Sequence, residues 1–237
     1  QKKRLGDAER KLKVKETKAA LNEQRIAASK IEASLERIAL LKGTQPHEDD
    51  NRIFPMTYAP IILQRDGHNV ITLARYHLRQ QGKPAFTDQK FPGLYNARRD
   101  NLDRYWRNEF GHTHALMVVD SFYENVERDG KNVVLHFTPR PAYQMLVACL
   151  YADWSDPQEG RLLSFAAVTD EPPPEIKAAG HDRCIINLRQ ENVEAWLTPN
   201  GRSDDELQAI LDDRQTPYYE HEILAALRYW VTEMHVD

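Results

Sequence analysis

The 237-residue sequence lacks the features that mark several large classes of protein. No apolar run is long enough to cross a bilayer, and no segment has the pattern of a secretory signal. Only two cysteines are present, Cys149 and Cys184, and both stand in apolar surroundings. A disulfide framework is therefore excluded, and buried thiols in a reducing compartment are expected. We expect a cytoplasmic protein with no membrane contact.

Motifs of common catalytic classes are missing as well. The sequence has no glycine-rich loop for phosphates and no serine nucleophile elbow. His112 and His114 of "GHTH" could form a metal pair, but no third ligand is apparent, so a structural or surface role is favoured. We predict no metal and no cofactor. A thiol hydrolase using Cys184 and His181 is conceivable, although a thiol at the start of an apolar strand is expected to point inward.

Charge is unevenly distributed along a chain that is 41% hydrophobic and 29% charged, with a formal net charge of −4. Between Lys2 and Lys42, twelve Lys and Arg stand against six Asp and Glu, so the remainder is acidic. Such asymmetry can indicate contact with nucleic acid or a membrane. It is equally typical of the solvated face of a long helix.

Residues 4–42 are expected to form one long amphipathic helix that ends at Gly43. The segment contains no proline and one glycine, and strong helix formers dominate it. Its narrow apolar stripe begins with a seven-residue repeat at Leu5, Leu12, Ala19 and Ile26. Because a narrow stripe needs a partner, self-association through residues 4–42 is one possibility and a sheet edge is another.

A polar link at 44–52 separates this segment from a different kind of sequence. We therefore divide the chain into a basic helical segment (1–46) and one further domain (47–237). Short β-branched runs with hairpin turns predict strands within 56–78, 113–127, 131–139, 143–154 and 161–170. Helices are expected near 98–108 and at 191–199, 203–213 and 221–234. Strands in hairpins predict an α+β fold, mostly antiparallel, rather than a doubly wound parallel sheet.

Three polar clusters interrupt the apolar segments. The first is "YNARRDNL", the second is "DSFYEN" with Glu124, and the third is "GHDR" with His181 and Arg183. Each cluster alone has an ordinary interpretation as a turn, a strand end or a surface ion pair. Together they suggest an acid/base histidine beside an anion-binding arginine.

The order of these motifs resembles that of the SOS-response-associated peptidase (SRAP) family, the abasic-site processing proteins. The matching segments are "TYAP" (57–60), "NAR" (96–98), "DSFYEN" (120–125), "ACLYADW" (148–154) and "HDR" (181–183). The resemblance covers roughly residues 53–200, and the set of motifs is specific. It implies a curved or barrel-like sheet flanked by helices, a DNA-damage role, and single-stranded DNA with abasic sites as the partner.

The resemblance also implies a covalent reaction. In the family, an amino-terminal cysteine exposed by removal of the initiator Met, a self-processing peptidase step, forms a thiazolidine with the abasic sugar aldehyde. By position, Asn96 would orient the amine or the sugar. Glu124 would be the general acid/base of imine formation, and His181 would move the proton of the sugar oxygen.

DNA contacts follow from the same resemblance. Arg98 and Arg183 would hold phosphates, because guanidinium groups bind them bidentately. The other implied DNA-binding residues are Arg99, Thr169 and Pro60. Aromatic rings near the expected pocket could stack on bases or simply pack the core; the candidates are Tyr58, Tyr95, Phe122 and Tyr123.

The sequence departs from the family pattern in three places, one of which is that "FPMTYAPII" lacks the family's asparagine before x-Ala-Pro. The family cysteine should precede the "TYAP" region, but a basic helical segment stands there, and neither internal cysteine has an α-amine. We expect the nucleophile upstream of Gln1, with residues 1–46 an insertion. In "ARYHL", Tyr76 or His77 replaces a base-stacking tryptophan. Two alternatives stay open, a non-catalytic single-stranded DNA binder and a helix-mediated interaction protein.

Overall fold

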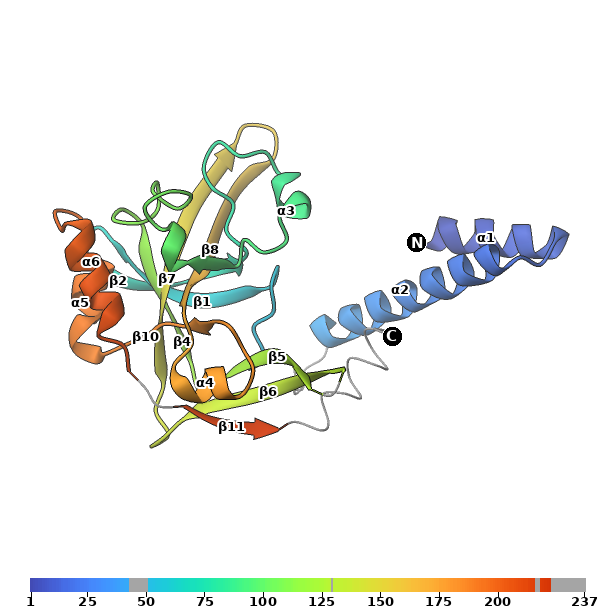
Figure 1. Cartoon of the computed structure of the whole chain (residues 1–237). Coiled ribbons are helices and arrows are strands. Elements are labelled where there is room, and N and C mark those ends of the chain that lie inside the picture. The colour runs from blue at the N-terminus through green and yellow to red at the C-terminus, as the bar shows by residue number, and fades with distance from the viewer. Residues whose placement is uncertain (43–50, 129, 216–217, 223–237) are drawn as a thin grey trace. The chain divides into compact units, whose positions relative to one another are not determined.

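The computed structural model describes residues 1–42, 51–128, 130–215 and 218–222 (Figure 1). The chain divides into two compact units, with Gln1–Arg52 in the first and Ile53–Trp230 in the second. Among the described residues, no helix combines the length and the apolar character needed to span a membrane.

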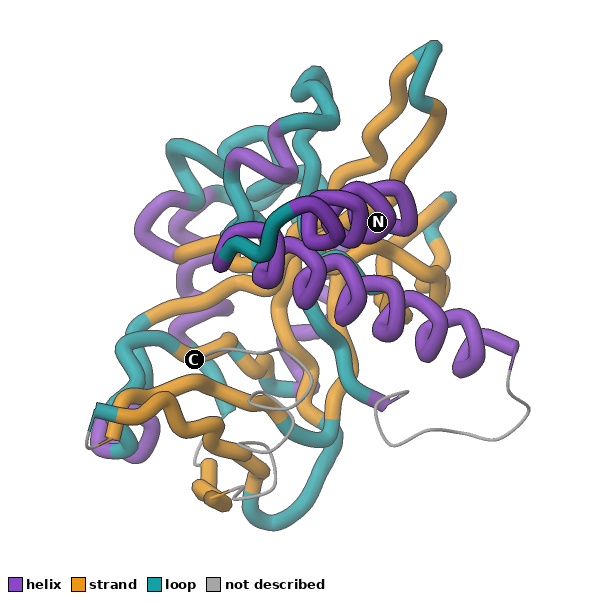
Figure 2. The backbone as a smooth tube through the Cα atoms, turned by 90° about the vertical axis from the view of Figure 1, so that its right-hand side faces the viewer, coloured by secondary structure: helices purple, strands orange, loops and turns teal. Residues whose placement is uncertain are grey.

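The first unit is a helical hairpin rather than one continuous helix. Helix α1 (Lys2–Val14) and helix α2 (Lys18–Lys42) run side by side, as Figure 2 shows. The break lies at Lys15, whose backbone is extended, and at Thr17, whose hydroxyl accepts the N–H of Ala20 at 3.2 Å. Threonine caps helix starts in this way, so Thr17 begins a second helix without help from glycine or proline. The apolar stripe of α1 thus finds a partner helix within the same chain.

A closed five-stranded barrel forms the centre of the second unit. Its strands are β1 (Tyr58–Arg65), β2 (His68–Tyr76), β4 (His114–Val119), β7 (Met145–Asp156) and β8 (Gly160–Asp170). The ring closes because β7 pairs with both β4 and β8. Only the β2–β8 pairing is parallel within this ring, so the barrel is mixed but mostly antiparallel. Three short strands extend it: β3 (Asn96–Arg98), β9 (Cys184–Ile185) and β10 (Asn187–Leu188).

A separate three-stranded sheet contains β5 (Phe122–Arg128), β6 (Lys131–Pro139) and β11 (Tyr218–Glu222). The single strand expected over 113–127 is therefore wrong. The chain leaves β4 at Asp120–Ser121 and enters the second sheet as β5. The expected helix at 221–234 begins within β11, and its residues after Glu222 lie outside the described part of the chain.

Short helices cover the sheets, namely α3 (Thr87–Lys90), α4 (Pro174–Ala178), α5 (Val193–Leu197) and α6 (Asp204–Asp212). Helix α6 begins with the expected cap, because the Ser203 hydroxyl and the Glu206 side chain bond each other's backbone N–H. The helix expected near 98–108 is wrong. A 3₁₀ turn at Arg99–Asn101 is followed by irregular turns, in which the Trp106 N–H bonds the Asn101 carbonyl.

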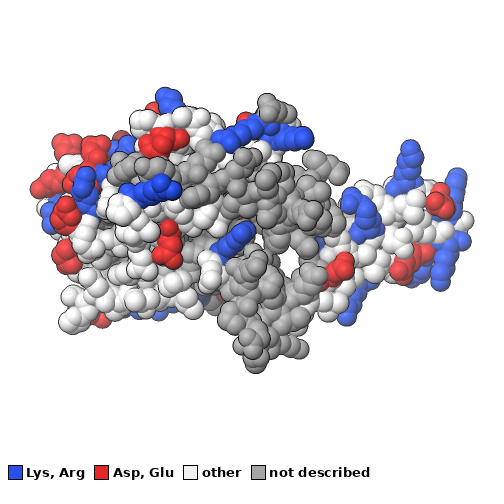
Figure 3. All heavy atoms as spheres, turned by 90° about the horizontal axis from the view of Figure 1, so that it is seen from below, with Lys and Arg blue, Asp and Glu red and all other residues white. Residues whose placement is uncertain are grey.

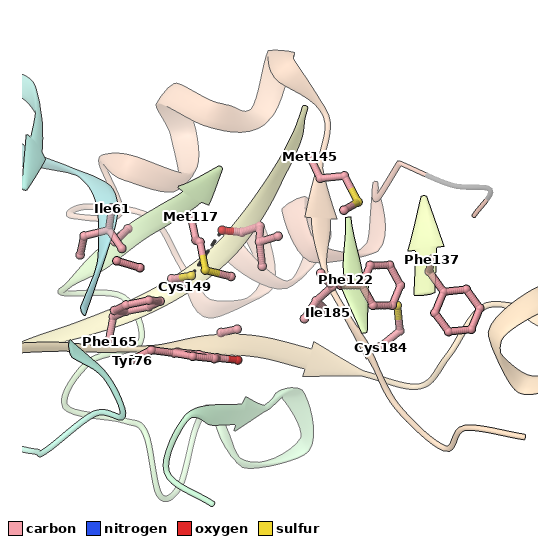
Figure 4. Close-up of a cluster of buried hydrophobic side chains, with 14 of the residues drawn as sticks. Ile61, Tyr76, Met117, Phe122, Phe137, Met145, Cys149, Phe165, Cys184 and Ile185 are labelled. Carbon is pink, nitrogen blue, oxygen red and sulfur yellow. Dashed lines mark hydrogen bonds between the residues drawn. The ribbon is translucent and has the colours of Figure 1, made fainter. Parts of the chain in front are cut away.

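Apolar side chains fill both sides of the barrel wall. The inner cluster includes Ile61, Tyr76, Met117, Cys149 and Phe165 and continues between the two sheets to Phe122, Phe137, Met145, Cys184 and Ile185 (Figure 4). The outer cluster packs alternate residues of the same strands under the helices, among them Leu116, Leu150, Trp196 and Leu207. Strand alternation therefore places every second side chain in each cluster. The predicted α+β fold with a barrel-like sheet is confirmed.

Candidate active site

Glu124 occupies an inward-facing position on β5. Alternation places it on the same face as Phe122 and Val126, which are buried in the inner cluster. Burial raises the pKa of Glu124 to about 7, although His181 and Arg183 act in the opposite direction. A carboxyl group with this pKa can give or take a proton near neutral pH.

His181 reaches this carboxyl from the loop after α4. Gly180 has a φ of +100°, in the region that favours glycine, and it turns the chain after the helix. The Nε2 atom of His181 then lies 3.1 Å from Oε2 of Glu124. The two side chains are 17% and 22% exposed, so the pair is largely shielded yet open to a ligand.

The backbone of Arg183 sets the tautomer of this histidine. Nδ1 of His181 lies 2.7 Å from the Arg183 carbonyl oxygen, which can only accept a hydrogen bond. The Arg183 N–H also approaches Nδ1, at 3.3 Å, but the shorter contact favours a proton on Nδ1. Nε2 is then directed at Glu124, so the ring nitrogen and the carboxyl can exchange one proton across the 3.1 Å contact. The pair can therefore hold and transfer a single proton.

Strands β3, β8 and β9 bring the first motif close to the third. Asn96 pairs with Ala167, Arg98 pairs with Thr169, and Thr169 pairs in turn with Ile185. Thr169 is 4% exposed, and its hydroxyl has no hydrogen-bond partner among the described residues. An unpaired buried hydroxyl costs folding free energy, so such a group is more usual where a ligand completes it.

Arg98 and Arg183 stay near the surface, each beside an aspartate. Arg98 makes two 3.1 Å bonds to the Asp100 carboxylate, and Arg183 contacts Asp182 at 3.3 Å. Asp100, and more weakly Asp182 and Glu171, raise the pKa of Arg98. The charge of Asp182 thus reaches Arg98, which places the "NAR" and "HDR" motifs in one electrostatic environment.

Two of the sequence-predicted DNA-binding residues do not join this group. Arg99 is 17% exposed and is held by Asp170, Asp212 and Gln208 at distances of 2.6 to 3.1 Å. Pro60 is exposed on β1 and alternates with Ala59, which is buried in the inner cluster. The contacts of Arg99 and the place of Pro60 in β1 are explained by the fold alone. Contact of either residue with DNA stays a prediction.

The aromatic candidates differ in exposure. Tyr58 is 61% exposed and Tyr123 is 38% exposed, whereas Phe122 is buried against Phe137 with ring centres 5.2 Å apart. Tyr95 is partly buried and meets Tyr76 edge to face. Phe122 therefore packs the core.

The residues at the missing tryptophan position are also buried. Tyr76 stacks on Phe165 inside the barrel, with ring centres 5.0 Å apart, and His77 is 1% exposed. Neither side chain presents an open ring face on which a base could stack.

The thiol and metal alternatives find little support. Burial raises the pKa of Cys184 well above its usual range, and the same holds for Cys149, so neither thiol ionises readily. His114 is buried and bonded to backbone at both ring nitrogens. Within the ranges the structure describes, no cluster of three His, Cys, Asp or Glu side chains could hold a metal ion.

Sequence reasoning included a surface ion pair among the ordinary interpretations of the polar clusters but did not name the acidic partners of the two arginines. Asp100 and Asp182 stand two residues and one residue from the cations they contact. The signal was present in "ARRD" and "HDR", because opposite charges at such short spacing often pair.

A family model described as SOS response associated peptidase (SRAP) matches residues 17–226. The abasic site processing protein YoaM of Bacillus subtilis (strain 168) is 28% identical over 121 residues, which is 50% of this chain and 53% of YoaM. The chain thus matches about half the length of this curated relative.

Solved structures with the same fold come from two further bacteria. A protein from Bacteroides thetaiotaomicron has a TM-score of 0.61 at 17% identity, covering 72% of this chain and 75% of its own. A protein from Bordetella bronchiseptica has a TM-score of 0.60 at 18% identity, covering 72% and 85%. A phage-related protein from the same organism has a TM-score of 0.56 at 19% identity, covering 72% and 79%. At these identities the likeness concerns the fold alone, but the family model spans most of the sequence, and the chain belongs to the SRAP family.

Proposed function

We propose that this protein processes abasic sites in single-stranded DNA and that Glu124 and His181 move the protons of the reaction. The observation that carries the proposal is the 3.1 Å contact between the His181 ring and a buried carboxyl whose pKa is about 7. Family membership and the name of the relative YoaM supply the substrate class. A cytoplasmic role in the DNA-damage response is part of the same proposal.

The reaction proposed is formation of a thiazolidine between an amino-terminal cysteine and the abasic sugar. Opening of the sugar ring breaks the bond between C1 and the ring oxygen. His181 delivers a proton to this oxygen, and the C1 hydroxyl gives up its own proton as it becomes the aldehyde, which restores the proton of the pair. The α-amine attacks the aldehyde, and one of its protons passes to the carbonyl oxygen. Glu124 protonates the resulting hydroxyl, which leaves as water, and takes back the second proton of the nitrogen to give the neutral imine. The thiol then adds to the imine carbon and its proton passes to nitrogen, so atoms and charges balance.

The nucleophile must be a 1,2-aminothiol, which only a cysteine at a chain terminus provides. Cys149 and Cys184 are internal and buried, so neither can take this part. We assign the nucleophile to an amino-terminal cysteine outside these 237 residues, exposed by self-processing of the initiator Met. Asn96, on the strand beside β8, would orient its amine or the sugar.

Phosphate binding is assigned to Arg98 and Arg183. In the absence of DNA their guanidinium groups contact the exposed carboxylates of Asp100 and Asp182, which are 57% and 77% exposed. Exposed ion pairs contribute at most about 1 kcal/mol, so a phosphate can replace the carboxylate at small cost. Thr169, whose hydroxyl has no hydrogen-bond partner in the described part of the chain, pairs with Arg98 in the sheet and would complete the contact.

The test uses protein expressed from the complete reading frame with its native start. It is mixed with a single-stranded oligonucleotide carrying one abasic site, and covalent products are separated on a denaturing gel. We expect a shifted band, strongly weakened in Glu124→Gln and His181→Gln. His112→Gln is the matched control, because this exposed histidine lies away from the pair.

The absence of a shifted band with native-start protein would refute the enzymatic proposal. If the same protein still bound the oligonucleotide, the site would be that of a non-catalytic single-stranded DNA binder. Full activity of both variants would leave DNA crosslinking in place but remove the assigned proton carriers.

A further inference from the structure

The helical hairpin carries a positive charge that the rest of the chain does not share. Residues 1–42 contain twelve Lys and Arg and six Asp and Glu, whereas residues 43–237 contain twenty and thirty. The excess is greatest between Lys2 and Lys18, with eight basic and three acidic residues. The positive charge is therefore concentrated on α1 and on the bend that follows it.

The structure shows which of these charges are already paired within the hairpin. Glu23 of α2 accepts from Arg4 at 3.2 Å and lies 3.5 Å from Lys11, and Arg10 pairs with Asp7. These pairs lie along the helices, and the two that share Glu23 join α1 to α2. They use Asp7 and Glu23, whereas Glu9 and Glu16 form no ion pair with a described residue.

Three lysines at the bend have no such partner. Lys13, Lys15 and Lys18 are exposed, and none makes an ion pair with a described residue. Figure 3 shows Lys and Arg side chains gathered on the hairpin around the end where α1 and α2 meet. Like charges at this spacing repel one another, and a bound polyanion would relieve the repulsion.

The hairpin presents these lysines on a defined frame. Ala8, Ala20 and Ala27 are buried, which lets the two helices approach closely. The Thr17 hydroxyl caps α2 immediately after the bend. The lysines therefore lie on an ordered surface at the turn.

We propose that the bend of this hairpin, comprising Lys13, Lys15 and Lys18, binds the phosphate backbone of the DNA strand that flanks the lesion. The proposal rests on the proposed function and assigns a contact with the same class of substrate to the first unit. Lysine ammonium groups act as point charges and read no sequence, so this contact would be independent of sequence.

The composition favours nucleic acid over a membrane surface. Residues 1–42 contain no Phe, Trp or Tyr, the residues that commonly anchor an interfacial helix in a bilayer. The same absence excludes base stacking, so the expected contact is with phosphates alone. Such contacts release counterions and make affinity fall steeply with salt.

The experiment measures binding of the full 237-residue chain to a fluorescent, undamaged single-stranded oligonucleotide across a salt series. The Lys13→Gln/Lys15→Gln/Lys18→Gln variant is expected to bind about tenfold more weakly at low salt. The slope of log affinity against log salt should become shallower by about 2, since each single-strand contact contributes about 0.7. The control, Lys83→Gln/Lys90→Gln/Lys131→Gln, changes three exposed lysines of the second unit and should leave the slope within error.

Equal slopes for the hairpin variant and the wild type would overturn the proposal, provided circular dichroism shows the helices intact. The proposal would also be overturned if the hairpin variant bound vesicles of anionic lipid more weakly than wild type but bound DNA equally well. That result would favour a membrane surface as the partner. Undamaged DNA keeps the test separate from the chemistry. If Glu124→Gln proved fully active in crosslinking, the role assigned to Glu124 would fail while the salt slope would still decide the role of the hairpin.

Discussion

His114 and His181 lie in the same unit, and each has one ring nitrogen bonded to a backbone carbonyl. In His114, Nδ1 donates to the Trp196 carbonyl at 2.9 Å and Nε2 accepts the Gly111 N–H, also at 2.9 Å. Its ring is buried against the Trp196 ring, with centres 3.9 Å apart. In His181, the carbonyl of Arg183 occupies Nδ1, and Nε2 meets the carboxyl of Glu124 instead.

The difference lies in what the second nitrogen contacts. Burial lowers the pKa of His114 to about 3, so this ring stays neutral and its proton stays on Nδ1. It holds the loop before β4 to the end of α5 and cannot transfer a proton. His181 has the same first bond but shares its second nitrogen with a titrating group. A histidine can therefore be assigned to proton transfer or to packing only when the hydrogen-bond partners of both ring nitrogens are known.

The largest effect expected from the comparison of the two histidines is on the rate of crosslinking. We expect Glu124→Gln and His181→Gln each to slow crosslinking of an abasic oligonucleotide by about 10² to 10⁴-fold. Because the two groups share one proton, the double variant should be little slower than either single variant. Single-turnover rates measure this directly. Losses that multiply in the double variant would mean that the two groups act independently.

A substitution of His114 should lower the stability of the fold and leave the crosslinking rate nearly unchanged. His114→Ala leaves a buried N–H and a buried carbonyl without partners and opens space beside Trp196, so we expect a loss of about 3 kcal/mol in unfolding free energy. Urea denaturation measures the loss. The folded fraction should crosslink at a rate within about twofold of wild type. A large rate loss in folded His114→Ala would show that the two histidines are coupled.

The pH dependence of stability tests the environment of Glu124. Its pKa in the folded state, about 7, lies above the ordinary value of 4.5, so the folded protein binds this proton more tightly than the unfolded chain. Wild type therefore loses stability as pH rises through this window, and the neutral Glu124→Gln side chain does not. The difference in unfolding free energy between wild type and Glu124→Gln should grow by up to about 3 kcal/mol between about pH 5 and about pH 8. Parallel curves would mean that Glu124 is not held in an apolar site.

Local patterns predicted much of what the structure contains. The hairpin around "RDGHN" and the capped helix at Ser203 depend on neighbouring residues, and both are present. The motifs around Asn96, Glu124 and His181 were found because their order resembles that of the family. The structure brings Glu124 and His181 into contact although 57 positions separate them, a distance no local pattern specifies.

The errors share one physical origin, which is competition between local preference and tertiary contacts. The segment 113–127 has strand propensity throughout, yet the barrel needs only its first half, and the remainder pairs with β6. Residues 98–108 could form a helix, but Arg99 is held by Asp170 and Asp212 from β8 and α6. The break before α2 had a local signal, because Thr17 can cap a helix. The surrounding strong helix formers nevertheless favoured the prediction of one continuous helix.

The smallest expected effect concerns Thr169, where packing and binding can be separated. Its hydroxyl is buried and without a partner among the described residues, so Thr169→Val should raise unfolding free energy by about 1 kcal/mol. If the hydroxyl bonds DNA, the same change should weaken binding of abasic single-stranded DNA about fivefold, the value of one hydrogen bond. Ser164→Ala is the control, because that buried hydroxyl already accepts the Arg79 N–H at 3.0 Å. It should lose stability and leave affinity unchanged. If the two variants change stability in opposite directions and only Thr169→Val loses affinity, Thr169 belongs to the DNA-binding site around Glu124 and His181. If neither variant changes affinity, Thr169 has only a packing role in the barrel.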